Sequence, residues 1–365
     1  MAILLSLERY LPAHRYDQDV VTAWAREWLQ SPDGPAPHGR EGGGRSSARL
    51  LSAFATAGVR TRASVVPIEE VFHPGDFETQ NRAYREMGCR AATEVASRAL
   101  AAASLAPSEI RMLVSVSCTG FMIPAVDAYV ANGLGLGPRL VRLPITEAGC
   151  AGGVVGLARA ADYLAAHPDH AALVLSLELA SLTFQRWDRS AANVVSTAIF
   201  GDGGAAAVLV GREHPRASAG LVRVREADAV FFPGTTRMMG FELRNEGLQI
   251  RLDKGLTAFV RREVAPAVDG FLAARGLSRA DISCFILHPG GRKIIDAMAD
   301  RLGLGPRDLA ATEAVLAQHG NMSSVTVLFV LDEVLRGCRP AAGSLGLLGA
   351  FGPGFAAELA LLEFL

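Results

Sequence analysis

The feature that most limits the fold of this chain is a set of short apolar runs that do not alternate with polar residues. Residues 112–116, 172–177 and 284–287 are almost wholly apolar. A strand with one face in water alternates apolar and polar side chains, whereas a strand covered on both faces is apolar throughout. These runs therefore predict a sheet that is covered by helices on both sides. The composition agrees, because 50% of the residues are apolar even before the 38 glycines are added.

Strand and helix patterns alternate along the chain, which is typical of an α/β protein. In the first half we expect strands at 112–117, 140–145, 172–179 and 204–210, and helices at 15–29, 46–57, 79–103, 125–133 and 151–163. The series restarts after about residue 215, with strands at 220–226, 245–252, 283–287, 344–350 and 356–363, and helices at 254–275, 291–302 and 323–336. A chain of 365 residues is long for one core. We expect two core-forming halves, 1–215 and 216–365, in one packed body, with the clearest loop at residues 31–45.

Charge and cysteine content exclude several classes of protein. The 36 basic and 37 acidic residues give a net charge of -1 and form no basic run, so nucleic acid is not an expected partner. The first residues lack the pattern of a secretory leader, and no window has eighteen uninterrupted apolar residues, which predicts a cytoplasmic protein without a membrane span. The five cysteines form no CxxC pair, so we expect reduced thiols and no metal site.

Cys150 is the candidate nucleophile. It lies between the apolar run 140–145 and the small-residue run 151–163, which predicts a cysteine at the N-terminus of a buried helix. A helix N-terminus favours the thiolate, the attacking form of cysteine. That effect amounts to roughly 0.3 to 2 kcal/mol, or about one pKa unit, which is too little to ionise a thiol at neutral pH. A cationic partner is therefore required.

His288 and Asn321 complete a possible reaction centre. His288 ends the apolar run 284–287 and precedes Pro-Gly-Gly, while Asn321 lies in a turn before another buried helix. Alone, each has an ordinary interpretation, as a turn histidine and a helix N-cap. Together they suit thioester chemistry: a Cys150 thiolate paired with a His288 imidazolium could attack an acyl thioester. His288 and Asn321 could also donate hydrogen bonds to a thioester carbonyl and to the enolate that malonyl decarboxylation leaves. Coenzyme A (CoA) thioesters would be substrates, and no cofactor would be needed.

The order Cys, His, Asn also occurs in papain-like hydrolases, which form an alternative of another class. In those enzymes a second cysteine and an aromatic residue surround the nucleophile. Residues 147–153 contain neither of these, and the chain has no secretory leader. The hydrolase interpretation is therefore the weaker one.

Six motifs occur in the order found in one family. They are SCTGFMIP at 117–124, EAGCAGG at 147–153, IFGDG at 199–203, LHPGG at 287–291, GNMSS at 320–324 and AFGPGF at 350–355. With these motifs the chain resembles bacterial type III polyketide synthases of the chalcone synthase superfamily, from about residue 59 to its end. The resemblance implies a thiolase-like fold, layered αβαβα from two similar halves, and a homodimer. A ketoacyl synthase III type enzyme, which performs one condensation with an acyl carrier protein, is the alternative within this fold.

The resemblance also assigns roles to individual residues. Cys150 would carry the acyl group, and His288 and Asn321 would bind and decarboxylate malonyl-CoA. Phe200 matches a gatekeeper between the CoA tunnel and the reaction cavity, and Ile250 takes the place of a second, aromatic gatekeeper. The CoA phosphates would meet Arg60 and Arg62. The remaining positions are a cavity lining of Cys118, Thr119, Ile123, Ala180, Thr183, Ser196, Phe241 and Ser323, and a backbone scaffold of Gly352, Pro353 and Gly354 beside the cysteine.

Two segments resemble alkylpyrone and alkylresorcinol synthases more than chalcone synthase. They are Phe241, where chalcone synthase has a glycine, and residues 178–185. We therefore expect a medium or long aliphatic acyl-CoA starter, repeated extension by malonyl-CoA and closure to an alkylpyrone or alkylresorcinol. An acyl carrier protein is a further candidate donor of the starter.

Overall fold

The computed structural model describes residues 1–31, 47–337 and 339–365. The predicted loop at 31–45, Ser31 apart, and Cys338 lie outside these ranges. The described chain alternates strands and helices as expected. Its first half contains β1 (Ala2–Tyr10), β2 (His14–Asp17), α1 (Gln18–Gln30), α2 (Ser47–Ala55), β3 (Thr61–Ser64), α3 (Ile68–Phe72), α4 (Phe77–Ala103), β4 (Ile110–Val116), α5 (Val126–Leu134), β5 (Val141–Ile145), α6 (Gly152–Ala166), β6 (Ala171–Leu179), α7 (Ala191–Ile199) and β7 (Asp202–Gly211).

The second half repeats the mixture of strands and helices. It contains β8 (Val222–Phe231), β9 (Met239–Arg244), β10 (Gly247–Leu252), α8 (Leu256–Ala273), β11 (Ile282–Leu287), α9 (Arg292–Leu302), α10 (Ala310–His319), α11 (Thr326–Arg336), β12 (Leu345–Gly352) and β13 (Ala356–Phe364). None of the helices within the described ranges has the length and apolar content needed to span a bilayer.

Nine of the described strands form one sheet in the order β11-β12-β13-β8-β1-β7-β6-β4-β5. Every residue of β6 and β7 is buried, as the unbroken apolar runs predicted. Strand β1 pairs along its length with β7 but meets β8 only through Ala2–Leu4. The two halves of the sheet are thus joined at one end, and helices can enter between them.

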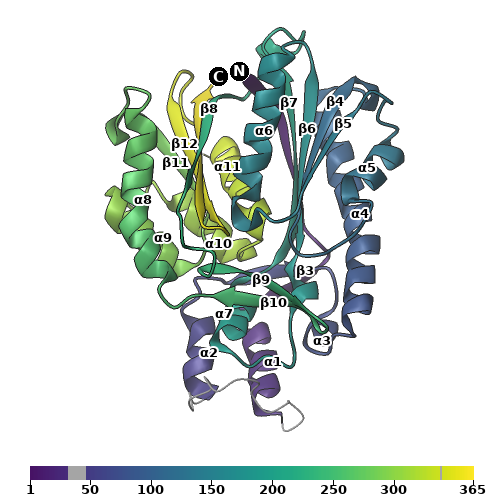
Figure 1. The fold of residues 1–365 in the computed structure, drawn as a ribbon, viewed down its shortest axis with the longest axis vertical. Helices are drawn as coiled ribbons and strands as arrows, with labels where there is room; N and C mark the ends of the chain where they lie inside the picture. Colours follow the sequence, from purple (N-terminus) through teal and green to yellow (C-terminus); the bar gives the residue numbers. More distant parts are fainter. Residues whose placement is uncertain (32–46, 338) are drawn as a thin grey trace.

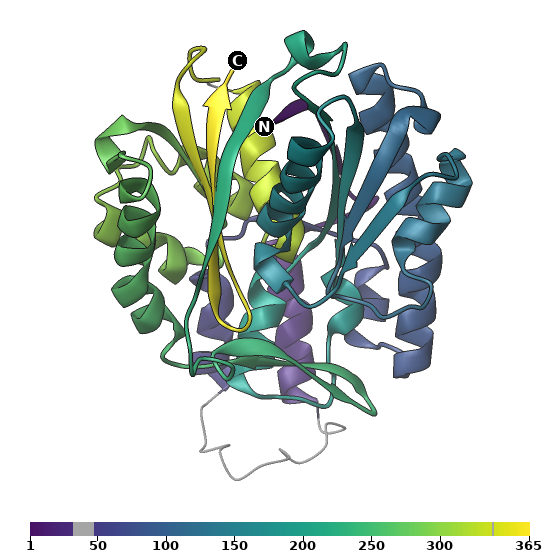
Figure 2. The same cartoon turned by 45° about the horizontal axis from the view of Figure 1, so that its top comes forward.

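Helices fill three layers around the two halves of the sheet (Figure 1). Helices α4 and α5 cover the outer face of the β4 to β7 half, and α8 and α9 cover the outer face of the β8 to β13 half. Helices α6 and α11 lie between the halves, where Val154, Leu157 and Phe329 belong to one buried cluster. Figure 2 shows the same arrangement from a second direction. The predicted αβαβα layering is confirmed.

The glycines of α6 allow the close packing of this central layer. A side chain at Gly153 would collide with the carbonyl of Ser324, and one at Gly156 would lie 3.0 Å from a methyl group of Val174. Helix α6 can therefore touch both the segment before α11 and strand β6. This contact brings the segment that precedes α6 close to the segment that precedes α11.

Several elements were not predicted from the sequence, namely β1, β2, β3, α3, α7, β9 and α10. The strand expected at 245–252 is the second strand of a hairpin, because β9 pairs with β10 from Met239 to Arg244. Helix α10 was not expected at all. It contacts both α11 and β3, so its apolar residues do not form the single stripe by which an amphipathic helix is predicted. The β9–β10 hairpin lies across one end of the two halves, next to α7 (Figure 1).

Candidate active site

Cys150, His288 and Asn321 line one cavity of about 480 Å³. They come from three elements. Cys150 lies in a short 3-10 turn, Gly149–Ala151, directly before α6, while His288 follows β11 and Asn321 follows α10. The structure thus brings together the three residues that the sequence analysis selected, although they are far apart in the chain.

Backbone contacts hold His288 and Asn321 in place. The N–H of His288 donates to the carbonyl of Gly349 at 2.9 Å, which extends the pairing of β11 with β12. The N–H of Asn321 donates to the carbonyl of Ile199 at 2.7 Å, and its carbonyl accepts from the N–H of Gly201 at 3.0 Å. Asn321 is thereby fixed beside Phe200 in a parallel β-bridge.

The scaffold loop lies against the turn that carries Cys150. Gly149 has a φ of +51°, and a side chain there would approach Pro353 to 2.6 Å. A side chain at Gly352 would approach the carbonyl of Ala148 to the same distance, 2.6 Å. Glycine is therefore required on both sides of this contact, which places the loop of Gly352, Pro353 and Gly354 next to the nucleophile.

Burial opposes the ionisation of both Cys150 and His288. Desolvation raises the pKa of Cys150 to about 11, although hydrogen bonds from Ser323 and Asn321 act in the lowering direction. Desolvation also lowers the pKa of His288 to about 3. Burial of each group thus favours the neutral thiol and the neutral imidazole over the predicted thiolate and imidazolium pair. A neutral imidazole can instead take the proton of the thiol as the sulfur attacks.

The alkylation rate of Cys150 should therefore keep rising with pH. Because the thiolate forms only as the pH approaches about 11, the rate with iodoacetamide should increase about tenfold per pH unit between pH 6 and 9. Peptide mapping by mass spectrometry would separate Cys150 from the half-buried Cys89. A rate that levels off below pH 8 would instead indicate a preformed ion pair.

The side chains of His288 and Asn321 are arranged to act on a ligand. Both ring nitrogens of His288 are buried and have no hydrogen-bond partner among the described residues. The Oδ1 atom of Asn321 accepts from the N–H of Ser323 at 2.8 Å and from the hydroxyl of Thr326 at 3.3 Å. The amide N–H₂ group of Asn321 remains for Cys150 and for a ligand in the cavity. His288 can donate from one ring nitrogen and accept a proton at the other, so both residues can act on a thioester.

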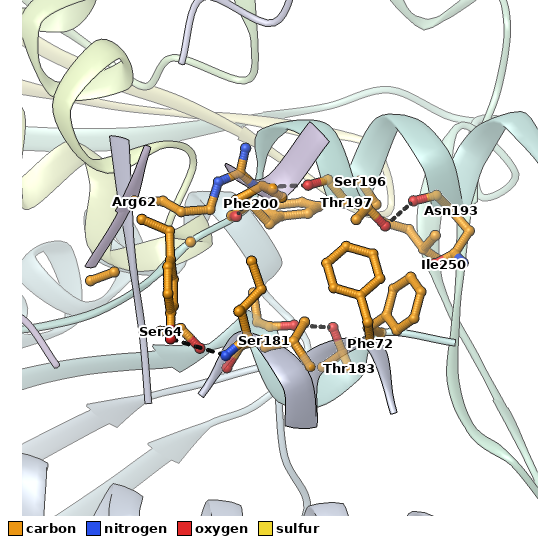
Figure 3. Close-up of a pocket in the computed structure, with 18 of the residues that line it drawn as sticks. Arg62, Ser64, Phe72, Ser181, Thr183, Asn193, Ser196, Thr197, Phe200 and Ile250 are labelled. Carbon is orange, nitrogen blue, oxygen red and sulfur yellow. Dashed lines mark hydrogen bonds between the residues drawn. The ribbon is translucent and has the colours of Figure 1, made fainter. Parts of the chain in front are cut away.

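A second, inner cavity of about 60 Å³ lies behind Phe200. Phe200 lines both this inner cavity and the outer cavity, which is the space of about 480 Å³ that contains Cys150. The predicted gatekeeper is therefore placed between the two spaces. Ile250, from the β9–β10 hairpin, lines the inner cavity, as Figure 3 shows. The other predicted lining residues that reach it are Ala180, Thr183, Ser196 and Phe241.

Four predicted lining residues do not reach either of these two cavities. Thr119 lines a separate space of about 10 Å³. Ile123 is 87% exposed and lines a surface hollow of about 400 Å³. Cys118 and Ser323 contact each other, with 3.3 Å between sulfur and oxygen, and Ser323 also bonds to the thiol of Cys150. These two residues form a layer around the nucleophile.

Glu178 is a buried carboxylate that was not selected from the sequence. It accepts hydrogen bonds from the N–H of Cys118 at 3.0 Å, the hydroxyl of Thr119 at 2.8 Å and the hydroxyl of Ser324 at 2.5 Å. Burial raises the pKa of Glu178. The signal in the sequence was a charged residue within an apolar strand, because such a residue is buried only when partners surround it.

The predicted role of Arg62 in CoA binding is wrong. Arg62 is 6% exposed, and its guanidinium donates to backbone carbonyls inside the protein. Arg60 is exposed but lines neither cavity. The basic residues that line the outer cavity are instead Arg49, Lys254, Arg292 and Lys293. No sequence pattern indicated them, because they come from α2, the turn before α8 and the start of α9.

Comparisons with known proteins agree with this site. Residues 77–214 and 223–365 match the N-terminal and C-terminal domains of chalcone and stilbene synthases. The chain is 40% identical to a 1,3,6,8-tetrahydroxynaphthalene synthase of Streptomyces peucetius, over 97% of this chain and 91% of that protein. It is 32% identical to the alpha-pyrone synthesis polyketide synthase-like Pks18 of Mycobacterium tuberculosis, over 83% of this chain and 79% of that protein.

A solved structure supports the same assignment. The crystal structure of 1,3,6,8-tetrahydroxynaphthalene synthase from Streptomyces coelicolor, a bacterial type III polyketide synthase, superposes with a TM-score of 0.90 at 30% identity and covers 99% of each chain. The cavity that Cys150, His288 and Asn321 line thus belongs to a known architecture. This chain is a member of the chalcone and stilbene synthase family, the type III polyketide synthases.

Proposed function

We propose that this polyketide synthase extends a short acyl starter with malonyl-CoA and closes the chain to a small hydroxylated aromatic product. The observation that carries the proposal is the size of the space behind the gate, about 60 Å³. This is about one eighth of the volume of the cavity that contains Cys150, which is about 480 Å³. A short chain suits it better than a long alkyl tail.

Loading of the starter begins with proton transfer. The neutral imidazole of His288 takes the proton of Cys150 while the sulfur attacks the acyl-CoA carbonyl, and the carbonyl oxygen becomes negative in the transition state. Donors of the buried site stabilise this oxygen. CoA then leaves as a thiol after it receives the proton from His288, and the acyl group remains on Cys150.

Extension uses His288 and Asn321 as hydrogen-bond donors to malonyl-CoA. His288 and Asn321 donate hydrogen bonds to the thioester carbonyl, which becomes an enolate oxygen when carbon dioxide leaves. The enolate carbon attacks the acyl group on Cys150, a carbon–carbon bond forms, and the thiolate of Cys150 is released. The extended chain is now on CoA, and its transfer back to Cys150 allows the next cycle.

A medium or long aliphatic starter, with an alkylpyrone or alkylresorcinol product, is the second candidate. It is favoured by the apolar lining that Ile250 and Phe241 give to the inner cavity, and by the alpha-pyrone named for the Mycobacterium tuberculosis relative. Flexible side chains of the β9–β10 hairpin would have to make room for the tail.

Product analysis separates the two candidates. The protein is incubated with labelled malonyl-CoA alone and with a panel of acyl-CoA and acyl-carrier-protein starters, and the products are identified by mass spectrometry. The short-starter proposal predicts a multiply extended, cyclised product from malonyl-CoA alone. A requirement for a starter of six or more carbons would overturn it in favour of the second candidate, and a single ketoacyl product would contradict both.

The basic residues around the outer cavity are the proposed site for the CoA phosphates. Lys254 and Lys293 are exposed and form no ion pair with any described residue, whereas Arg292 pairs with Asp296 and Glu313. Exposed ion pairs contribute roughly 0.2 to 1 kcal/mol each. Changing both lysines to alanine should therefore raise the KM for malonyl-CoA by about two- to thirtyfold and leave kcat unchanged.

The control for the lysine variant is malonyl N-acetylcysteamine, a thioester without the nucleotide and its phosphates. Its KM should be the same in the variant and the unchanged protein. An equal rise of KM for both thioesters would show that the lysines act on the cavity itself and would refute their role in phosphate binding.

The exposed position of Ile123 is explained if a second copy of the chain covers it. Ile123 is 87% exposed and Phe121 53% exposed. The two residues line one surface hollow together with Tyr129, which is 40% exposed. We therefore propose a homodimer through this surface. Light scattering should give twice the mass of the chain, and Ile123→Glu should shift the protein toward monomer; a monomeric unchanged protein would overturn the proposal.

A further inference from the structure

Arg62 binds the C-terminal end of helix α7. The last carbonyls of a helix have no partner inside the helix and need donors from elsewhere. The guanidinium of Arg62 donates to the carbonyls of Thr197 at 2.7 Å, Ala198 at 2.5 Å and Phe200 at 2.6 Å. Its remaining partner is the side-chain oxygen of Gln18, whose Nε2 atom donates to Ala198 as well, at 2.9 Å. One buried cation thus holds three backbone carbonyls at the end of the helix that leads to Phe200.

The chain on the other side of Phe200 is held in the same region. The carboxylate of Asp202 accepts from the N–H of Val65 at 2.7 Å and from the N–H and hydroxyl of Ser181 at 2.8 and 2.5 Å. Val65 directly follows β3, the strand that carries Arg62. The backbone on either side of the Phe200 ring is therefore held by β3 and by the residue after it.

The same contacts reach the reaction centre through the backbone. Asn321 is bonded to Ile199 and Gly201, the two neighbours of Phe200, at 2.7 and 3.0 Å. A shift of the end of α7 must therefore move Asn321 or break these bonds. Figure 3 shows Arg62 next to Phe200 at the inner cavity.

Arg62 cannot exchange these partners for a phosphate. Burial lowers its pKa to about 9, while the charge of Asp202 acts in the raising direction, so the guanidinium stays protonated at neutral pH. Its side chain is inside the protein, and its hydrogen-bond partners among the described residues are all protein oxygens. Arg62 therefore acts on groups of the protein itself and not on a ligand.

We propose that Arg62 is a positioning residue that holds Phe200 between the two cavities and Asn321 beside Cys150. The inference rests on the proposed function, because it concerns the same gate and the same amide. Its consequence differs from that of a CoA-binding residue: loss of Arg62 should slow decarboxylation and extension rather than weaken substrate binding.

The first test compares Arg62→Lys with the unchanged protein. Lysine keeps the charge but cannot reach three carbonyls from one planar group. Since hydrogen bonds to charged groups are worth roughly 1.5 to 3 kcal/mol, kcat for malonyl-CoA decarboxylation should fall about tenfold or more. The KM should change less than about twofold, and acyl loading of Cys150, measured by intact mass, should persist. Early-released, short products should increase relative to the full-length product.

Two further variants keep the test decisive. Gln18→Met removes one partner of Arg62 but leaves its bonds to Thr197 and Phe200, so it should give a smaller change in the same direction even if Arg62→Lys does not fold. Arg15→Lys is the matched control: Arg15 is exposed on β2 opposite Ala63, and the one hydrogen bond of its side chain to a described residue goes to the hydroxyl of Thr61. It should behave like the unchanged protein.

The outcomes distinguish the two proposals. If the unchanged protein makes a polyketide but Arg62→Lys and Gln18→Met keep its kcat and product pattern, the positioning role is refuted and the function stands. If KM rises with kcat unchanged, Arg62 acts in substrate binding and the inference is again wrong. If the unchanged protein fails to extend malonyl-CoA, the proposed function itself has failed.

Discussion

Replacing Cys150 with alanine should abolish the acyl-enzyme and the polyketide product, while malonyl-CoA is still decarboxylated. In the proposed mechanism the Cys150 sulfur forms the only covalent bond between the protein and the growing chain. Its loss should therefore lower product formation at least about a thousandfold. Decarboxylation requires donors at the thioester carbonyl, and His288 and Asn321 remain in the cavity. Intact-mass measurement after incubation with acyl-CoA should show no adduct, and released acetyl-CoA should still be detected.

Two other cysteines provide the controls for this experiment. Cys89→Ala changes a half-buried thiol on α4 and should leave the adduct and the product unchanged. The Cys118 thiol lies close to the reaction centre, but burial and the charge of Glu178 raise its pKa well above that of an ordinary thiol, so it should carry no acyl group. An adduct that persists in Cys150→Ala and maps to Cys118 would reverse these roles.

The layered fold could be predicted because its strands are covered on both faces. Runs such as 172–177 have no polar face to display, and only helices on both sides of a sheet produce that pattern. Elements with several faces in contact could not be predicted in this way. Helix α10 contacts α11 on one side and β3 on another, so its sequence has no single apolar stripe.

The three central residues could be predicted because each stands beside a glycine-rich turn at the end of an element. Their pKa shifts could not be predicted from the sequence. A helix dipole and a charged partner can be inferred from neighbouring residues, but desolvation depends on the whole packed site. For Cys150 desolvation is the largest cause and raises the pKa to about 11.

Arg62 shows the same limit for a charged residue. The family resemblance assigned Arg62, together with Arg60, to the CoA phosphates. Burial depends instead on helix α7 and Gln18, which meet Arg62 only in the folded chain. The residues that do surround the outer cavity come from three separate elements, and no local pattern joins them. Sequence motifs thus indicate the reactive residues, whereas contacts between distant segments determine which charged side chains face the substrate.

Replacing Asn321 with alanine should damage decarboxylation far more than acyl loading. In the proposed mechanism the amide donates to the oxygen that becomes an enolate, and loss of one such donor costs about a hundredfold to a thousandfold in kcat. Loading depends chiefly on Cys150 and His288, so the adduct measured by intact mass should form at a rate within about tenfold of the unchanged protein. Stopped-flow detection of carbon dioxide and time-resolved intact mass would measure the two steps separately.

The variant Asn321→Asp tests whether the N–H₂ donor of Asn321, rather than its side-chain oxygen, is required. The Oδ1 atom of Asn321 also accepts from Ser323 and Thr326, so alanine removes two internal bonds together with the donor. Aspartate keeps the shape and these acceptors but replaces the N–H₂ group with an oxygen, and its negative charge would repel the enolate. Decarboxylation should therefore be as slow in Asn321→Asp as in Asn321→Ala, although the fold is better preserved. Near-normal decarboxylation in the aspartate variant would mean that Asn321 supports the local structure, and His288 alone would then stabilise the enolate.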